Sequence, residues 1–180
     1  MCSSDLVWDN PLQVAEAFAM IDMISRGRLV SGIVRGGGTE QYALNVNPVY
    51  NRDRLEEAHD LLIKTWTQPG PFRWDGDHYN FRVVNPWAVP MQKPHPRIWI
   101  PGTSSNETIE WAAAHRYPYI GLGTNEERQK RIINIYNDTA RSLGYEPGPQ
   151  NFGQLTSIIA QDTEEKALKN AEEFDWMAGE

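Results

Sequence analysis

RIWIPGTSSNETIEWAAAH, residues 97–115, is the stretch that decides the fold. Residues 97–100 form a short apolar run, which predicts a strand. A turn rich in serine and threonine follows, and residues 106–115 then predict a short helix. A second apolar run at residues 119–122 starts a few residues later and predicts another strand. Strand, helix and strand in this order indicate a parallel βαβ unit.

The same alternation continues on both sides of this unit and gives one leading helix followed by four strand–helix units. Such an order implies parallel strands with right-handed crossovers. An open doubly wound sheet satisfies it, and so does about half of an eight-stranded (β/α) barrel, whose usual length is about 250 residues. Periodicity leaves both architectures open. The flanking elements are expected as helices at 11–24, 53–67, 126–143 and 163–174 and as strands at 29–34 and 152–160.

Two segments stand apart from this pattern. Residues 68–96 hold six of the 12 prolines, so we expect an insertion without a long helix there. Within it, Asp75-Gly76 between two aromatic runs predicts a hairpin of residues 72–74 and 78–81. Residues 1–6 resemble a translated sequencing adapter, and we expect a non-native scar there, with one domain over 7–180 that is cut at both ends.

Composition narrows the function classes. The chain has 180 residues with 17 Lys+Arg against 24 Asp+Glu, a net charge of −7, which disfavours a nucleic-acid partner. No apolar run approaches the roughly 20 residues of a membrane span, and no secretory signal is visible, so we expect a soluble cytoplasmic protein. The single cysteine excludes a disulfide scaffold, and the four scattered histidines lack the close pairing of metal sites. We therefore expect no metal.

Two strand ends carry the chemistry. Arg35 ends the strand at 29–34, directly before three glycines, and the turn at 102–108 follows the strand at 97–100. Residues after parallel strands gather on one rim, where ligands bind. Helix N–H groups and hydroxyls in that turn, with a guanidinium beside them, would suit a phosphate. The alternative is an ordinary N-cap at Ser105 or Asn106 and an ion pair between Arg35 and Glu40.

At this point the residues resemble the luciferase-like flavin monooxygenase family, from about residue 10 to at least residue 123 and more weakly to residue 173. The order and spacing of the matching pieces are specific for the superfamily and say little about the substrate. The matching pieces are NPLQVAE at 10–16, IDMISRGRL at 21–29, GIVRG at 32–36, Arg52 and Glu57, Phe81 to Pro86, QKPHP at 92–96, and 103–108 followed by EWAA at 110–113.

The resemblance implies a partial TIM (β/α)8 barrel, about strands 4–7 with the third helix in front. It implies reduced FMN as cofactor, or a deazaflavin in some branches, and phosphate contacts at Arg35, Ser104, Ser105 and Thr108. The implied reaction uses O2 to oxygenate a small organic substrate, with a flavin reductase supplying reduced FMN. A deazaflavin-dependent oxidoreductase and a non-catalytic flavin-binding relative stay open as alternatives.

The resemblance leaves the catalytic residue unknown, because in this family it comes from the first strands of the barrel. We therefore expect this fragment to be inactive by itself, and the full-length protein to be a dimer through the helix at 11–24. Glu40 and Tyr42, just beyond the glycines, either face the flavin or substrate pocket or belong to an exposed lid. Asp22 and Arg28 lie at the opposite rim, where we expect them to pair and hold a turn.

Overall fold

The computed structural model describes residues 2–68, 70–123, 125–156 and 158–175. Its main sheet has the strand order β1-β2-β5-β6-β7, and every neighbouring pair is parallel. Strand order therefore follows chain order without reversal, as in a barrel, whereas a doubly wound sheet reverses at its switch point. This confirms the α/β prediction and favours the partial barrel. The strands are β1 (Cys2–Asp5), β2 (Val30–Val34), β5 (Arg97–Gly102), β6 (Tyr119–Leu122) and β7 (Phe152–Leu155).

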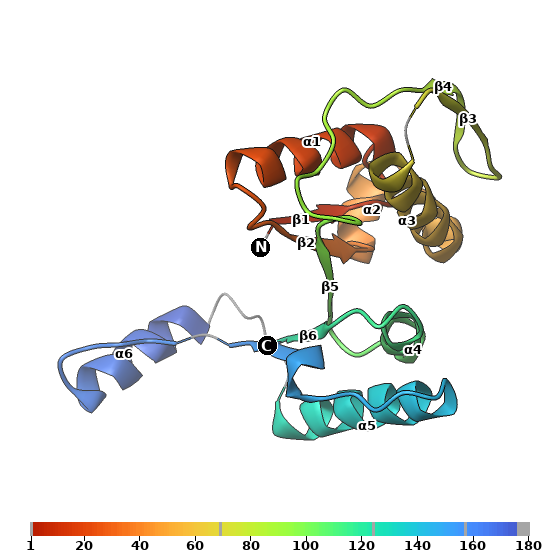
Figure 1. The fold of residues 1–180 in the computed structure, drawn as a ribbon. Helices are drawn as coiled ribbons and strands as arrows, with labels where there is room; N and C mark the ends of the chain where they lie inside the picture. Colours follow the sequence, from red (N-terminus) through yellow and green to blue (C-terminus); the bar gives the residue numbers. More distant parts are fainter. Residues whose placement is uncertain (1, 69, 124, 157, 176–180) are drawn as a thin grey trace.

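Helices α1, α3, α4 and α5 lie around the sheet, while α6 extends away from the rest of the chain at lower left (Figure 1). The first helix begins where the sequence predicts, because the Asn10 side chain accepts hydrogen bonds from the amides of Leu12 and Gln13 at 3.0 and 3.4 Å. The helices are α1 (Pro11–Ile24), α2 (Gly38–Ala43), α3 (Asn51–Thr67), α4 (Asn106–Ala114), α5 (Glu126–Ser142) and α6 (Glu164–Asp175), with 3-10 turns at Pro48–Tyr50 and Pro149–Asn151.

One hydrophobic core joins the strands to the surrounding helices. It also contains a directional contact, since the indole Nε1 of Trp66 on α3 donates to the carbonyl oxygen of Ala15 on α1 at 2.9 Å. This packing holds the strands in a fixed order and so fixes where their carboxyl ends lie. Fully buried members of the core include Ile33, Leu55, Leu62, Ile100, Ile109 and Ile132.

Three elements differ from the sequence prediction. Residues 1–6 were left out of the predicted fold, yet β1 pairs with β2, and the side chains of Leu6 and Val7 that follow it are buried. The glycine run leads into α2, which was not predicted; Gly37 is its N-cap residue, and the Glu40 carboxylate accepts from the Gly37 amide at 2.6 Å. Strand β7 ends at Leu155 rather than at residue 160.

The proline-rich segment forms the predicted hairpin, with β3 (Phe72–Asp75) antiparallel to β4 (Asn80–Val84). Glu57 on α3 fastens it to the domain. The carboxylate of Glu57 accepts from the Trp74 indole at 2.9 Å and from the amides of His78 and Tyr79 at 2.7 and 3.0 Å. A Cβ at Gly76 would overlap this carboxylate, so any larger residue there would displace Glu57 from the hairpin.

Replacing Glu57 with glutamine is expected to lower the free energy of unfolding by about 1–2 kcal/mol, because one carboxylate oxygen becomes a donor facing an amide. Burial acts to raise the pKa of Glu57, but its three hydrogen bonds outweigh burial and leave the pKa below the ordinary 4.5. The stabilisation is therefore complete above pH 4.5 and is lost as the pH falls through the lower folded-state pKa.

Urea unfolding of the wild type and Glu57→Gln at neutral pH and below pH 4 would measure this difference. The exposed Glu110→Gln on α4 is the matched control and should change little. A difference between wild type and Glu57→Gln that stays constant down to pH 3 would contradict the assignment.

The turn after α1 is structural, as expected, but the predicted pair of Asp22 with Arg28 is wrong. The buried carboxylate of Asp22 accepts from the amide of Leu29 at 3.4 Å and from the side chain and amide of Gln92 at 2.7 and 2.9 Å. Arg28 instead donates through Nε to the carbonyl oxygen of Ser25 at 2.7 Å. Gln92 satisfies the carboxylate without burying a guanidinium, whose desolvation is costly.

No helix in the described part of the chain has the length and apolar character needed to cross a bilayer.

Candidate phosphate and flavin site

A cavity of about 520 Å³ lies at the carboxyl ends of β2, β5 and β6. This is the rim at which ligands bind in parallel α/β folds. Apolar side chains form much of its wall, and charged and hydroxyl-bearing side chains also line it. The lining residues are Ile33, Val34, Arg35, Gly36, Gly37, Glu40, Leu55, Pro101, Gly102, Thr103, Ser105, Thr108, Tyr119, Leu122 and Leu155.

Arg35 supplies positive charge to this cavity. None of the ion pairs within the described residues involves its guanidinium. Burial, and next the nearby guanidinium of Arg52, lower the pKa of Arg35, while Glu107 and Tyr119 oppose the shift. An anion placed here would relieve the repulsion between the two guanidinium groups and complete the hydrogen bonds of a partly buried cation.

The turn between β5 and α4 lines the same cavity as Arg35. Ser105 is the N-cap residue of α4, but its hydroxyl makes no capping hydrogen bond to the helix. The first amides of α4 and the Ser105 hydroxyl are therefore available to an anion at a helix N-terminus. Ser105 and Thr108 both line the cavity with Arg35, whereas Ser104 lies in the same turn but outside the lining. The structure thus brings three of the four predicted phosphate contacts together.

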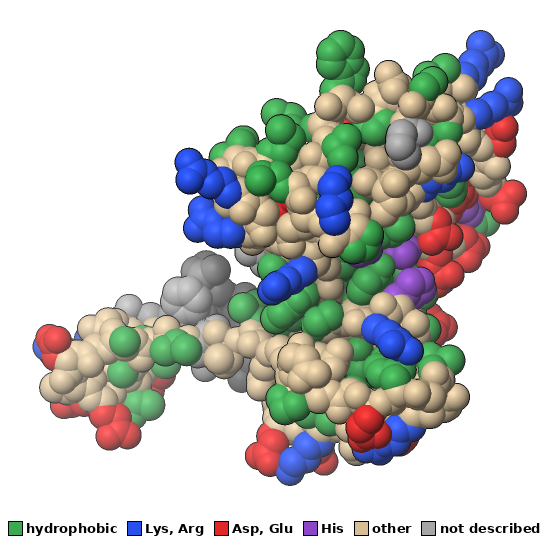
Figure 2. Space-filling model, viewed as in Figure 1, with side chains coloured by type: hydrophobic (Ala, Val, Ile, Leu, Met, Phe, Trp, Pro, Cys, Tyr) green, Lys and Arg blue, Asp and Glu red, His purple; other side chains and the backbone are tan. Residues whose placement is uncertain are grey.

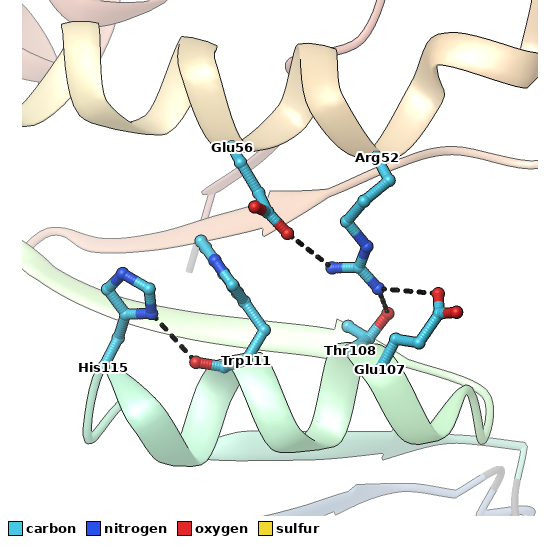
Figure 3. Close-up of polar contacts among 6 residues, drawn as sticks. All are labelled: Arg52, Glu56, Glu107, Thr108, Trp111 and His115. Atoms are coloured by element: carbon cyan, nitrogen blue, oxygen red, sulfur yellow. Dashed lines mark hydrogen bonds and ion pairs between the residues drawn. The ribbon is translucent and has the colours of Figure 1, made fainter.

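Arg52 belongs to the same cluster, although the sequence prediction did not place it in the site (Figure 3). From the first turn of α3 its Nη2 donates to Thr108 Oγ1 at 3.0 Å and lies 3.5 Å from Glu107 Oε2. Its Nη1 lies 3.6 Å from Glu56 Oε1. Because Thr108 Oγ1 accepts from Arg52, the hydroxyl proton of Thr108 can be donated into the cavity.

Glu40 and Tyr42 occupy different positions. Glu40 lines the cavity, but its carboxylate is already bound to the Gly37 amide, so the alternative ion pair with Arg35 does not form. Tyr42 is 73% exposed and lies outside the lining residues, which agrees with the exposed-lid reading for that side chain. Buried Gln41 between them donates to the carbonyl oxygen of Arg35 at 3.0 Å and anchors the end of β2.

The histidines show no metal-binding arrangement in the described ranges, where no group of three or more His, Cys, Asp or Glu side chains could hold a metal ion. His59 is buried, and its ring nitrogens lie 3.1 Å from Asp60 Oδ1 and 3.0 Å from the Tyr117 hydroxyl. Burial lowers the pKa of His59 despite the neighbouring Asp60, which favours the neutral ring. Its role is therefore to join α3 to the segment before β6.

The donor set suits a phosphate monoester with an apolar body. Arg35, two hydroxyl groups and the amides of α4 can bind the phosphate oxygens, and Ile33, Leu55 and Leu122 offer an apolar wall beyond them. Thus an FMN molecule fits the chemistry of the cavity, with Arg35, Ser105 and Thr108 as the residues that would hold its phosphate. The described lining residues offer no nucleophile paired with a base.

Comparison with known proteins bears on this geometry. The sequence profile of the luciferase-like monooxygenase family matches residues 3–178. The chain is 29% identical over 162 residues to an FMNH2-dependent dimethylsulfone monooxygenase of Pseudomonas putida, covering 88% of this chain and 43% of that protein. It is 30% identical over 171 residues to the oxygenase component of a flavin-dependent trigonelline monooxygenase of Acinetobacter baylyi, covering 92% and 46%.

Solved structures share the fold. The oxygenating constituent of 3,6-diketocamphane monooxygenase from Pseudomonas putida, solved with FMN, superposes with a TM-score of 0.80 at 18% identity, covering 95% of this chain and 51% of that one. An F420-dependent secondary alcohol dehydrogenase superposes with a TM-score of 0.69 at 18% identity, covering 84% and 47%. The chain therefore spans about half the length of the proteins it resembles, and its sheet corresponds to part of a luciferase-like TIM barrel.

Proposed function

This chain belongs to the luciferase-like monooxygenase family, and from that premise we propose that it carries the phosphate-binding part of a monooxygenase that uses reduced FMN and O2 to oxygenate a small organic substrate. The observation that carries the proposal is the convergence of Arg35, Ser105 and Thr108 on one cavity at the N-terminus of α4. The FMNH2-dependent and flavin-dependent relatives support the choice of flavin.

Residues of this chain bind and orient the cofactor. Arg35 and the first turn of α4 fix the phosphate, and Arg52 holds Thr108 in place. A fixed phosphate positions the apolar ring system against the cavity wall, where water is excluded. When bound, reduced FMN would supply two electrons to O2, so that one oxygen atom is transferred to the substrate and the other leaves as water. We name no catalytic residue, and we expect the 180-residue chain to be inactive by itself.

Titration of FMN and riboflavin against the chain, followed by quenching of flavin fluorescence, tests this function. The two ligands share the ring and differ in the phosphate, so FMN is expected to bind at least about tenfold more tightly. Inorganic phosphate should compete with FMN and leave riboflavin binding unchanged. Equal affinities for the two flavins would overturn the proposed phosphate site.

A deazaflavin-dependent oxidoreductase is the second candidate, because an F420-dependent enzyme shares the fold. F420 also carries a phosphate, so the same polar residues would serve. Parallel titrations with FMN and F420 distinguish the two, and the first proposal requires FMN to bind more tightly.

The proposed partners are a flavin, a small organic substrate, a flavin reductase that supplies reduced FMN, and a second copy of the whole protein. The relative described as an oxygenase component supports a separate reductase. The exposed face of α1 supports the dimer. Hydrophobic side chains stand over this helix in Figure 2, and Met20, Met23 and Ile24 are 54%, 50% and 79% exposed.

A further inference from the structure

The hydroxyl of Tyr119 is a buried polar group for which the described residues provide no hydrogen-bond partner. Tyr119 opens β6, opposite Ile100 of β5, and its relative exposure is 0%. It is also one of the residues that line the candidate site. A fully buried hydroxyl without a partner is uncommon, because burial removes its hydrogen bonds to water and nothing replaces them.

Other buried tyrosines of this chain satisfy their hydroxyl groups. Tyr79 donates to the carbonyl oxygen of Leu6 at 3.0 Å, and Tyr136 donates to that of Tyr117 at 3.0 Å. The hydroxyl of Tyr117 itself lies 3.0 Å from His59 Nε2. The exception is therefore particular to Tyr119, the tyrosine at the cavity.

The position of the hydroxyl explains the exception. A Cβ on Gly102 would overlap the Tyr119 hydroxyl, so the ring extends along the sheet from the start of β6 to the end of β5. Gly102 directly precedes the turn that leads into α4. Only glycine leaves room for the hydroxyl there, and the hydroxyl reaches the base of the phosphate site.

The Tyr119 hydroxyl is protonated at neutral pH and can act as a hydrogen-bond donor. Burial raises the pKa of Tyr119 to about 12, although the Arg35 guanidinium opposes the shift. At neutral pH the hydroxyl therefore keeps its proton and can donate it to an acceptor. The nearby guanidinium of Arg35 can only donate, and the hydroxyl groups of Ser105 and Thr108, which line the same cavity, can donate as well. The acceptor that completes this group is an anion.

We propose that Tyr119 is a ligand-binding residue whose hydroxyl donates a hydrogen bond to a phosphate oxygen of the molecule bound in the cavity. The proposal rests on the phosphate site of the proposed function and adds a donor from β6 to those of Arg35 and α4.

Tyr119→Phe removes the hydroxyl and keeps the ring. Its affinity for FMN and for inorganic phosphate is expected to fall at least about tenfold, the scale of one lost hydrogen bond to an anion. Without ligand its thermal midpoint should equal or exceed that of the wild type, because the hydroxyl has no protein partner to lose. Flavin fluorescence and isothermal titration of phosphate measure binding, and thermal unfolding followed by circular dichroism measures stability.

Tyr136→Phe is the matched control. It loses a formed hydrogen bond, so its thermal midpoint should fall while its phosphate affinity stays unchanged. A Tyr119→Phe protein that behaves in this way would overturn the proposal, as would unchanged affinity for both ligands.

The two proposals fail in different ways. If wild type binds inorganic phosphate but not FMN, and Tyr119→Phe weakens the phosphate complex, the flavin assignment is wrong and the role of Tyr119 stands. If FMN binds equally to both proteins, the role of Tyr119 is wrong and the flavin assignment stands. If the wild type binds neither FMN nor inorganic phosphate, both proposals are overturned.

Discussion

Arg35→Ala is expected to weaken FMN binding by about 1.5–3 kcal/mol, or roughly 10- to 150-fold, the scale of hydrogen bonds to a charged group. Arg35 lines the same cavity as Ser105, the N-cap residue of α4, and none of the ion pairs among the described residues involves its guanidinium. Removing it takes away a charge and a two-pronged donor together. Arg52 remains, but its hydrogen bond to Thr108 already occupies one side of its guanidinium.

Flavin fluorescence quenching of wild type and Arg35→Ala with FMN and with riboflavin measures the effect. The loss should be large for FMN and small for riboflavin, which has no phosphate for Arg35 to bind. Arg35→Lys keeps the positive charge but lacks the planar guanidinium, so its affinity for FMN should lie between those of the wild type and Arg35→Ala. The exposed Arg82→Ala on β4 is the matched control for net charge. An equal loss for both flavins would mean that Arg35 supports the cavity rather than the phosphate.

The elements of this fold follow from local patterns, but the choice between barrel and open sheet does not. Helical spacing and the Asn10 cap place α1, and an apolar run places β5, since both signals lie within a few neighbouring residues. Strand order is a long-range property. The two architectures use the same βα units, so only the pairing of β2 with β5 and of β5 with β6 distinguishes them.

Local patterns also missed β1 and α2. Residues 2–5 resemble a translated adapter, and this resemblance predicts no strand, yet they pair with β2. Helix α2 begins in a glycine run that disfavours helix. The cap that Glu40 provides to Gly37 offsets this preference, and such a contact is difficult to weigh from glycine content alone.

The candidate site divides in the same way. Arg35, Ser105 and Thr108 could be predicted because residues after parallel strands meet at one rim. Arg52 approaches that rim from a helix, and Tyr119 reaches it from the far end of its own strand through the length of its ring. Neither residue directly follows a parallel strand, so that argument does not predict them. Arg52 carried a signal only through its place in the family pattern, and the hydroxyl of Tyr119 becomes conspicuous only when its missing partner is known.

Asp22 illustrates the limit most clearly. The sequence identified its turn as structural, but the predicted partner, Arg28, is a cation only six residues along the chain. The actual partner, Gln92, lies 70 residues away in the proline-rich segment. Gln92 also donates to the carbonyl oxygen of Leu29 at 2.8 Å, so one side chain connects the end of α1, the start of β2 and the insertion.

Asp22→Ala is accordingly expected to lower the free energy of unfolding by about 3 kcal/mol, the scale of removing a buried, fully hydrogen-bonded carboxylate. Three donors, the Leu29 amide and both donors of Gln92, lose their acceptor at once. Donors buried without a partner cost more than the hydrogen bonds themselves contribute. Asp22→Asn keeps one acceptor oxygen, so we expect about half this loss. Urea unfolding followed by circular dichroism measures both variants.

The exposed Asp138→Ala on α5 controls for the loss of one negative charge and should change stability by less than about 0.5 kcal/mol. Gln92→Ala removes the side-chain donor from the other side of the same contact. If the two side chains act together, the losses of Asp22→Ala and Gln92→Ala should sum to more than the loss of the double variant. If the losses in free energy of unfolding are additive, the two side chains do not interact. Gln92 would then not anchor the proline-rich segment to the rim opposite the candidate phosphate site.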